Sequence, residues 1–196
     1  MSQLKENVNY LPQEKFNLIL NYVAFNLKPK KLNALDVQMI FKIAYHAGLR
    51  INEVLKLSKS SFDFNLLQIN LGKTKTKSHD LATFPASFSK ELQDYFLNKS
   101  ISQNDLLFPI SRQTVYTWIM QIGLALQIPA WTTPQTESGE KTKTHLFRKS
   151  IAKNMLYKKA PLNVIMNKLR HTNLATTSDY LKLNLSDVQT WENENL

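Results

Sequence analysis

Apolar residues recur at intervals of three and four along much of the chain, the spacing of one buried helix face. The first such segment covers residues 12–27 and a second covers residues 35–47. Gly48 follows the second segment and suits the left-handed conformation that often ends a helix. A short helix is predicted over residues 51–57, so Arg50 is expected in a turn between two helices.

A different pattern follows from residue 66. Residues 66–71 and 81–84 are short, partly alternating apolar runs, which is typical of β-strands. The residues between them are polar and rich in lysine, with Lys73, Lys75 and Lys77 at alternate positions. The sequence therefore predicts a β-hairpin with a long basic tip.

Helical spacing returns in the rest of the chain and predicts a mainly α fold with a small antiparallel β-sheet. Residues 128–143 contain two prolines and a glycine and are predicted to form a loop. We expect one domain over residues 1–196, ending in an amphipathic tail at 184–196. The further predicted helices lie around residues 88–96, 115–126, 146–157, 162–169 and 176–183.

Composition limits the class of protein. The 196 residues are 43% hydrophobic and 20% charged, as in a globular protein with a substantial core. The chain has no cysteine, which excludes disulfides and thiolate metal sites. No apolar run is long enough to span a membrane, and the N-terminus has no apolar signal core. We therefore expect no membrane partner and a cytoplasmic, nucleoid-associated location.

Positive charge is concentrated in the last third of the chain. The formal net charge is +10 and the pI is about 9.7, which favours a polyanion as partner. Between residues 141 and 182 there are ten Lys or Arg residues and one acidic residue, whereas only acidic charges follow. The distribution favours nucleic acid, although a basic protein can also be merely basic.

The same region contains an ordered set of reactive side chains. His145 and Arg148 are three residues apart on a predicted helix and so share a face. His171 follows Arg148 by 23 residues, and Tyr180 comes nine residues later. Taken singly, His145 and Arg148 can be surface residues at chance spacing, and Tyr180 can be a buried aromatic residue. Glu53, three residues after Arg50, is interpreted as a structural partner for a basic side chain.

Taken together, these residues resemble the catalytic domain of the tyrosine recombinases, the phage-integrase family of DNA strand-exchange enzymes. The resemblance extends over roughly residues 35–183. It rests on four stretches, which are residues 47–57, 73–77, 145–148 and 169–180.

The resemblance implies a catalytic role for each matching residue. Arg50 and Arg148 would hold the scissile phosphate, His145 would assist proton transfer, and His171 would donate a hydrogen bond to the phosphate. Tyr180 would be the nucleophile, forming a 3′-phosphotyrosyl bond and releasing a 5′-hydroxyl. A tyrosine, with a pKa of about 10, needs a base or a strong positive field to act near neutral pH, and this set supplies both.

The resemblance also implies a lysine that protonates the leaving oxygen, and Lys75 is chosen among the three hairpin lysines. Double-stranded DNA is the expected partner, bound by a dimer or tetramer of the chain. No cofactor or metal is expected, since the set lacks a carboxylate cluster suited to Mg²⁺. The residues expected to contact DNA are Lys73, Lys77, Lys141, Lys143, Lys149 and Arg170.

The chain departs from the family pattern at several points. Arg170 stands where the family usually has a glycine and is expected to crowd the approach of helix and DNA. Lys149 stands where a histidine is common. Only about 35 residues precede the family-like block, so no separate N-terminal domain is expected and the chain resembles short recombinases that invert promoter segments. The alternatives are a type IB topoisomerase-like enzyme and a DNA-binding regulator or accessory protein that keeps the fold without turnover.

Overall fold

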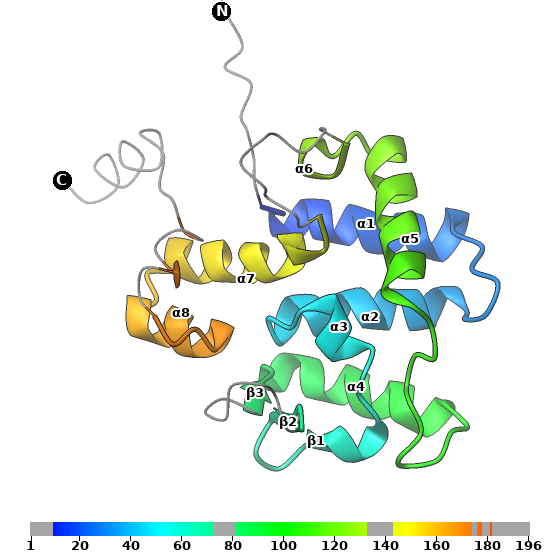
Figure 1. Ribbon diagram of the computed structural model, residues 1–196, viewed down its shortest axis with the longest axis horizontal. Helices are drawn as coiled ribbons and strands as arrows, with labels where there is room; N and C mark the ends of the chain where they lie inside the picture. The colour runs from blue at the N-terminus through cyan, green and yellow to red at the C-terminus, as the bar shows by residue number, and fades with distance from the viewer. Residues whose placement is uncertain (1–9, 73–80, 133–142, 174–175, 178–180, 182–196) are drawn as a thin grey trace, which may run out of the picture.

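The computed structural model describes residues 10–72, 81–132, 143–173, 176–177 and 181. Its elements confirm the mainly helical fold with a small antiparallel sheet (Figure 1). The helices are α1 (Gln13–Asn26), α2 (Ala34–His46), α3 (Ile51–Val54), α4 (Ala86–Asn98), α5 (Arg112–Ala125), α6 (Pro129–Thr132), α7 (Leu146–Tyr157) and α8 (Leu162–Leu169), with short 3₁₀ turns η1 (Lys59–Ser61) and η2 (Lys143–His145).

Helix α2 lies at the centre of the molecule and packs against α1, α3 and α7 (Figure 1). Its side chains Val37, Ile40 and Ile43 are fully buried, because the helix is surrounded by other elements. A capping box begins the helix. The Asn33 side chain accepts from the Asp36 backbone N–H at 2.8 Å, and the Asp36 carboxylate accepts from the Asn33 N–H at 3.1 Å. The central helix is thus fixed at the end opposite the site.

The end of α2 confirms the predicted turn. Gly48 has a φ of +64°, and the Leu49 N–H donates to the Ala44 carbonyl at 3.1 Å, which closes the helix. Arg50 follows as the N-cap residue of α3. Its backbone is therefore held between two helices, as the sequence predicted.

The sheet contains the two predicted strands, β2 (Gln68–Asn70) and β3 (Leu81–Thr83), and a strand that was not predicted, β1 (Phe62–Asp63). The order is β1-β2-β3 and both pairings are antiparallel. Two residues are too few to give an alternating pattern, which explains why β1 was missed. The hairpin tip at 73–80 lies outside the described residues.

The predicted loop at 128–143 begins with a short helix, α6, instead. Trp131 on α6 is fully buried, and its indole N–H donates to the Lys143 carbonyl at 3.0 Å. Gly123 on α5 faces this ring so closely that a Cβ there would lie 2.6 Å from the Trp131 Cβ. The absence of a side chain at Gly123 therefore allows α5 and α6 to pack. Residues 133–142 lie outside the described residues.

Helices α7 and α8 have the bounds predicted from the sequence and pack side by side (Figure 1). A small apolar cluster of Ala152, Ile165, Leu169 and Leu181 joins them to the segment that follows. Within the predicted helix 176–183, the described residues 176, 177 and 181 are helical. The tail at 184–196 lies outside the described residues. In the part of the chain that the structure describes, no helix is both long and apolar enough to cross a membrane.

Candidate active site

Arg50 presents its guanidinium at the turn between α2 and α3. Its side chain is 46% exposed, and its Nη1 donates to Glu53 Oε1 at 3.0 Å. The Arg50 backbone N–H donates to Glu53 Oε2 at 2.7 Å. Glu53 therefore fixes both the backbone and the side chain of Arg50, and its predicted role as a structural partner is confirmed.

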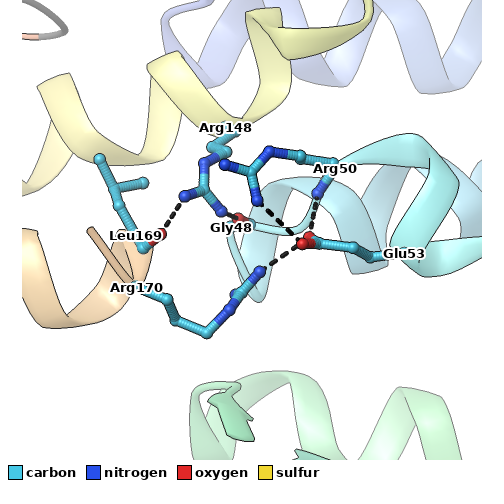
Figure 2. Close-up of polar contacts among 6 residues, drawn as sticks. All are labelled: Gly48, Arg50, Glu53, Arg148, Leu169 and Arg170. Atoms are coloured by element: carbon cyan, nitrogen blue, oxygen red, sulfur yellow. Dashed lines mark hydrogen bonds and ion pairs between the residues drawn. The ribbon is translucent and has the colours of Figure 1, made fainter. Parts of the chain in front are cut away.

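Arg148 lies on α7 and is fully buried. Its Nη1 donates to the Gly48 carbonyl at 2.7 Å, and its Nη2 donates to the Leu169 carbonyl (Figure 2). One guanidinium thus joins the turn after α2 to the end of α8. The side chains of Arg148 and Arg50 extend into the same region between α3, α7 and α8 (Figure 2).

His145 lies at the end of η2, immediately before α7, and not within the helix as the sequence indicated. Burial lowers the pKa of its imidazole to about 4, together with the positive charges of Arg50, Arg148 and Arg112. The ring is therefore neutral at pH 7. A neutral imidazole can accept a proton, and the positive charges that lower its pKa also make it a weaker base.

His171 follows the end of α8 and is 7% exposed. Its Nδ1 lies 3.0 Å from the Thr177 hydroxyl oxygen, which holds the ring in one orientation. Burial lowers its pKa to about 4, with further contributions from Arg148, Arg50 and Arg170. His171 is thus also neutral at pH 7 and lies in the field of the same arginines.

Arg170 forms the C-cap of α8 with a left-handed backbone, φ 52° and ψ 42°. Only 5% of its side chain is exposed, and its Nη2 lies 2.7 Å from Glu53 Oε2. This left-handed backbone was not predicted from the sequence. The position requires a backbone conformation that glycine adopts without strain.

Some of the basic residues expected to contact DNA are described by the structure, and others lie outside the described residues. Lys143 is half-buried, with its Nζ 3.2 Å from the Met120 sulfur, and Lys149 is half-buried on α7. The expected nucleophile and several lysines lie outside the described residues, and their roles stay predictions. These are Lys73, Lys75, Lys77, Lys141 and Tyr180.

Two basic residues near the site were not identified from the sequence. Lys168 donates from Nζ to the Thr83 carbonyl at 2.7 Å and so ties α8 to β3. Burial and the charge of Arg170 lower the pKa of Lys168 to about 8. Arg112 begins α5 and contributes to the field at His145. Lys168 could have been noticed as part of the basic last third, whereas nothing in the sequence marks Arg112.

The described site therefore combines three guanidiniums, two neutral imidazoles and one carboxylate. Guanidinium donors match the oxygens of a phosphate, and neutral imidazoles can exchange protons at pH 7. The arrangement suits binding and proton transfer at an anionic phosphate group.

Comparison with known proteins agrees with this chemistry. Residues 9–186 match the model of the phage integrase family. The chain belongs to this family. Among curated phage integrase relatives, tyrosine recombinase XerD of Rickettsia prowazekii is 27% identical over 191 residues, covering 90% of this chain and 59% of XerD. The chain thus spans little more than half the length of this relative.

Solved structures of the family confirm the fold. The catalytic domain of bacteriophage HP1 integrase aligns with a TM-score of 0.62 at 16% identity, covering 95% of this chain and 94% of that domain. XerH site-specific recombinase, in a post-cleavage complex with palindromic difH substrate, aligns with a TM-score of 0.68 at 18% identity. That alignment covers 94% of this chain and 52% of XerH.

Proposed function

We propose that this chain is a tyrosine-type site-specific recombinase that cuts and rejoins double-stranded DNA through a 3′-phosphotyrosyl intermediate. The observation that carries the proposal is the meeting of Arg50, Arg148, His145 and His171 around one positive site, although they come from distant parts of the sequence. Family membership and the DNA complex of XerH support DNA as the substrate.

In the proposed reaction, Arg50 and Arg148 stabilise the charge on the phosphate as Tyr180 Oη attacks phosphorus and the bond to the 5′ oxygen breaks. The Tyr180 proton passes to neutral His145, and Lys75 protonates the departing 5′ oxygen. The phosphotyrosyl bond keeps the energy of the broken phosphodiester, so a different 5′-hydroxyl can reverse the step and rejoin the strands.

The buried guanidinium of Arg148 adds a structural condition to this mechanism. Its Nη atoms donate to the Gly48 and Leu169 carbonyls, and the side chain has no exposed surface. Contact with a phosphate therefore requires the residues that cover Arg148 to move when DNA binds. Arg50, which is 46% exposed, needs no such opening.

We further propose that the chain acts as a dimer or tetramer on paired sites in the cytoplasm, associated with the nucleoid. The tail at 184–196 would pack against a neighbouring subunit. Contacts to the DNA backbone would come from Lys73, Lys77, Lys141, Lys143 and Lys149, whose positive charges position the duplex without reading its sequence.

The experiment that tests the function traps the covalent intermediate. The protein is mixed with nicked duplexes drawn from DNA that flanks its gene, in which the cleaved strand diffuses away, and the products are resolved on a denaturing gel. We expect a protein–DNA band that is lost in Tyr180→Phe but kept in Tyr116→Phe, a matched substitution on α5. Salt-sensitive DNA binding at a demonstrated site without any such band would instead indicate a DNA-binding regulator.

A further inference from the structure

Arg170 occupies a backbone position that disfavours it. The residue ends α8 in the left-handed region, with a φ of 52°, where a side chain is strained and glycine is not. The side chain is not left in solvent, since only 5% of it is exposed. An arginine at such a position places a guanidinium inside the site that a glycine could not supply.

The guanidinium of Arg170 contacts the carboxylate that holds Arg50. Glu53 Oε2 accepts from Arg170 Nη2 at 2.7 Å and from the Arg50 backbone N–H at 2.7 Å, while Oε1 accepts from Arg50 Nη1 at 3.0 Å. Figure 2 shows Glu53 between the two arginines, with Arg170 approaching from the end of α8. The carboxylate is therefore shared by one buried guanidinium and one that is 46% exposed.

The shared carboxylate is electrostatically dominated by Arg170. Burial tends to raise the pKa of Glu53, but the net shift is downward, and the charge of Arg170 is the largest of the effects that lower it. Arg50 contributes through its backbone N–H and, least, through its charge. Glu53 thus stays ionised and bound to Arg170. Its negative charge is shared between Arg170 and Arg50, so it neutralises Arg50 only in part. Glu53 also tends to raise the pKa of His145.

In the structure the Arg170 guanidinium faces Glu53 and is not at the surface. Its Nη1 is buried and has no hydrogen-bond partner among the described residues, and its Nη2 is bound to Glu53. The contacts that the structure shows link Arg170 through Glu53 to Arg50, which is the exposed member of the three.

We propose that Arg170 is a positioning residue, which fixes Glu53 so that the Arg50 guanidinium is held at the DNA phosphate without being neutralised. The inference rests on the proposed function for its role at the phosphate. It adds Arg170 to the pair of Arg50 and Glu53 at the α2–α3 turn.

Three substitutions at residue 170 separate the guanidinium from the backbone. Arg170→Gly removes the guanidinium and relieves the left-handed strain, Arg170→Ala removes it and keeps the strain, and Arg170→Lys keeps a positive charge near Glu53. We expect the Gly and Ala variants to cleave nicked duplexes about tenfold more slowly at saturating protein, with DNA affinity within about threefold of the original. Arg170→Lys should recover most of the rate. Cleavage at the original rate in both the Gly and Ala variants would overturn the proposal.

A double-mutant cycle with Glu53→Gln shows whether Arg170 acts through Glu53. We expect Arg170→Gly to have no further effect on the cleavage rate when Glu53 is already replaced, because the link to Arg50 is then broken. An equal loss of rate in both backgrounds would show that Arg170 acts independently of Glu53, and the proposal would be wrong.

A measurement without DNA separates this inference from the proposed function. The Glu53 carboxyl carbon, assigned with Glu53→Gln, is titrated by ¹³C NMR in the original chain and in Arg170→Gly. We expect a higher Glu53 pKa in the variant, because the largest lowering effect is removed. An unchanged pKa overturns the positioning role whether or not the chain cleaves DNA. A raised pKa without any covalent complex in the original chain supports the pairing and overturns the recombinase function instead.

Discussion

The burial of Arg148 determines how the site is built at the scale of single residues. A guanidinium without exposed surface requires hydrogen-bond acceptors, and the Gly48 and Leu169 carbonyls supply them from two different elements. The same side chain is expected to bind the phosphate, so one residue joins the elements of the site and takes part in its chemistry.

Arg148→Lys should therefore destabilise the fold. An ammonium group cannot span two carbonyls with the planar geometry of a guanidinium, and an acceptor left unpaired in the interior costs about 1–3 kcal/mol. We expect the free energy of unfolding to fall by that amount in urea denaturation followed by circular dichroism. Arg112→Lys, at an exposed position on α5, is the matched control and should change it by less than about 0.5 kcal/mol. Equal stability of the two variants would show that the carbonyl contacts of Arg148 contribute little.

The buried histidines predict a loss of stability in mild acid. The pKa values of His46, His145 and His171 are each lowered to about 4, with burial as the largest cause. The unfolded chain takes up protons below about pH 6.5, whereas the folded chain does so only near pH 4. These histidines therefore leave the free energy of unfolding unchanged above pH 6.5. As the pH falls from 6.5 to 4, the unfolded chain binds more protons than the folded chain, and the free energy of unfolding falls progressively.

Proton NMR of the histidine rings and urea denaturation at pH 7 and pH 5 test this expectation. The rings of these three residues should titrate near pH 4, and unfolding should need less urea at pH 5. Glu53 and Asp36 have lowered pKa values and so stay ionised in this window, which separates their effect from that of the histidines. Ring titration near 6.5 with equal stability at both pH values would contradict the prediction.

At the scale of elements, the close packing of α5 on α6 predicts that a side chain at Gly123 destabilises the fold. Glycine to alanine within a helix ordinarily stabilises by about 0.5–1 kcal/mol. At Gly123 the new Cβ would meet the Trp131 Cβ at 2.6 Å, and neither atom belongs to a flexible side-chain end. We expect Gly123→Ala to lower the free energy of unfolding by about 1–3 kcal/mol instead. Thermal unfolding measured by calorimetry shows whether Gly123→Ala stabilises or destabilises the fold. Gln121→Ala on the same helix is the control.

The helices differ in how well they could be predicted from the sequence. Helices α7 and α8 were predicted with their observed bounds, because their apolar spacing and the proline before α8 are local signals. Helix α6 was missed, since its four residues lie in a segment whose prolines and glycine indicate a loop. Its position depends on the burial of Trp131 against Gly123, which is a contact between elements and leaves no local pattern.

In the site, too, local sequence signals were predictive and contacts between elements were not. The order of Arg50, His145, Arg148 and His171 predicted a common site, and the structure brings these residues together. The resemblance did not reveal that Arg148 is buried against backbone carbonyls or that Arg170 adopts a left-handed backbone and pairs with Glu53. Both features depend on how α8 meets the turn after α2, and this tertiary geometry has no counterpart in residue spacing.

At the scale of the whole molecule, the uneven distribution of charge predicts how DNA binding responds to salt. Residues 141–182 have ten Lys or Arg residues and one acidic residue, and they include most of the site. Each phosphate that is neutralised releases counterions, so the logarithm of the binding constant should fall linearly with the logarithm of salt concentration, with a slope of about −0.9 per contact. We expect a steep negative slope in fluorescence anisotropy with a duplex between about 50 and 200 mM salt.

Single substitutions determine whether the slope arises at the proposed surface. Lys149→Gln, on α7 beside Arg148, should weaken binding to all sequences and reduce the magnitude of the slope by about one, as expected for a lost phosphate contact. Lys90→Gln is the matched control, because it removes the same charge from α4 instead of α7, at a residue 3.1 Å from Asp94. An equal reduction for both variants would mean that DNA responds to the overall charge of the chain. A reduction for Lys149 alone would place the duplex against α7, where Arg50, Arg148 and Arg170 meet.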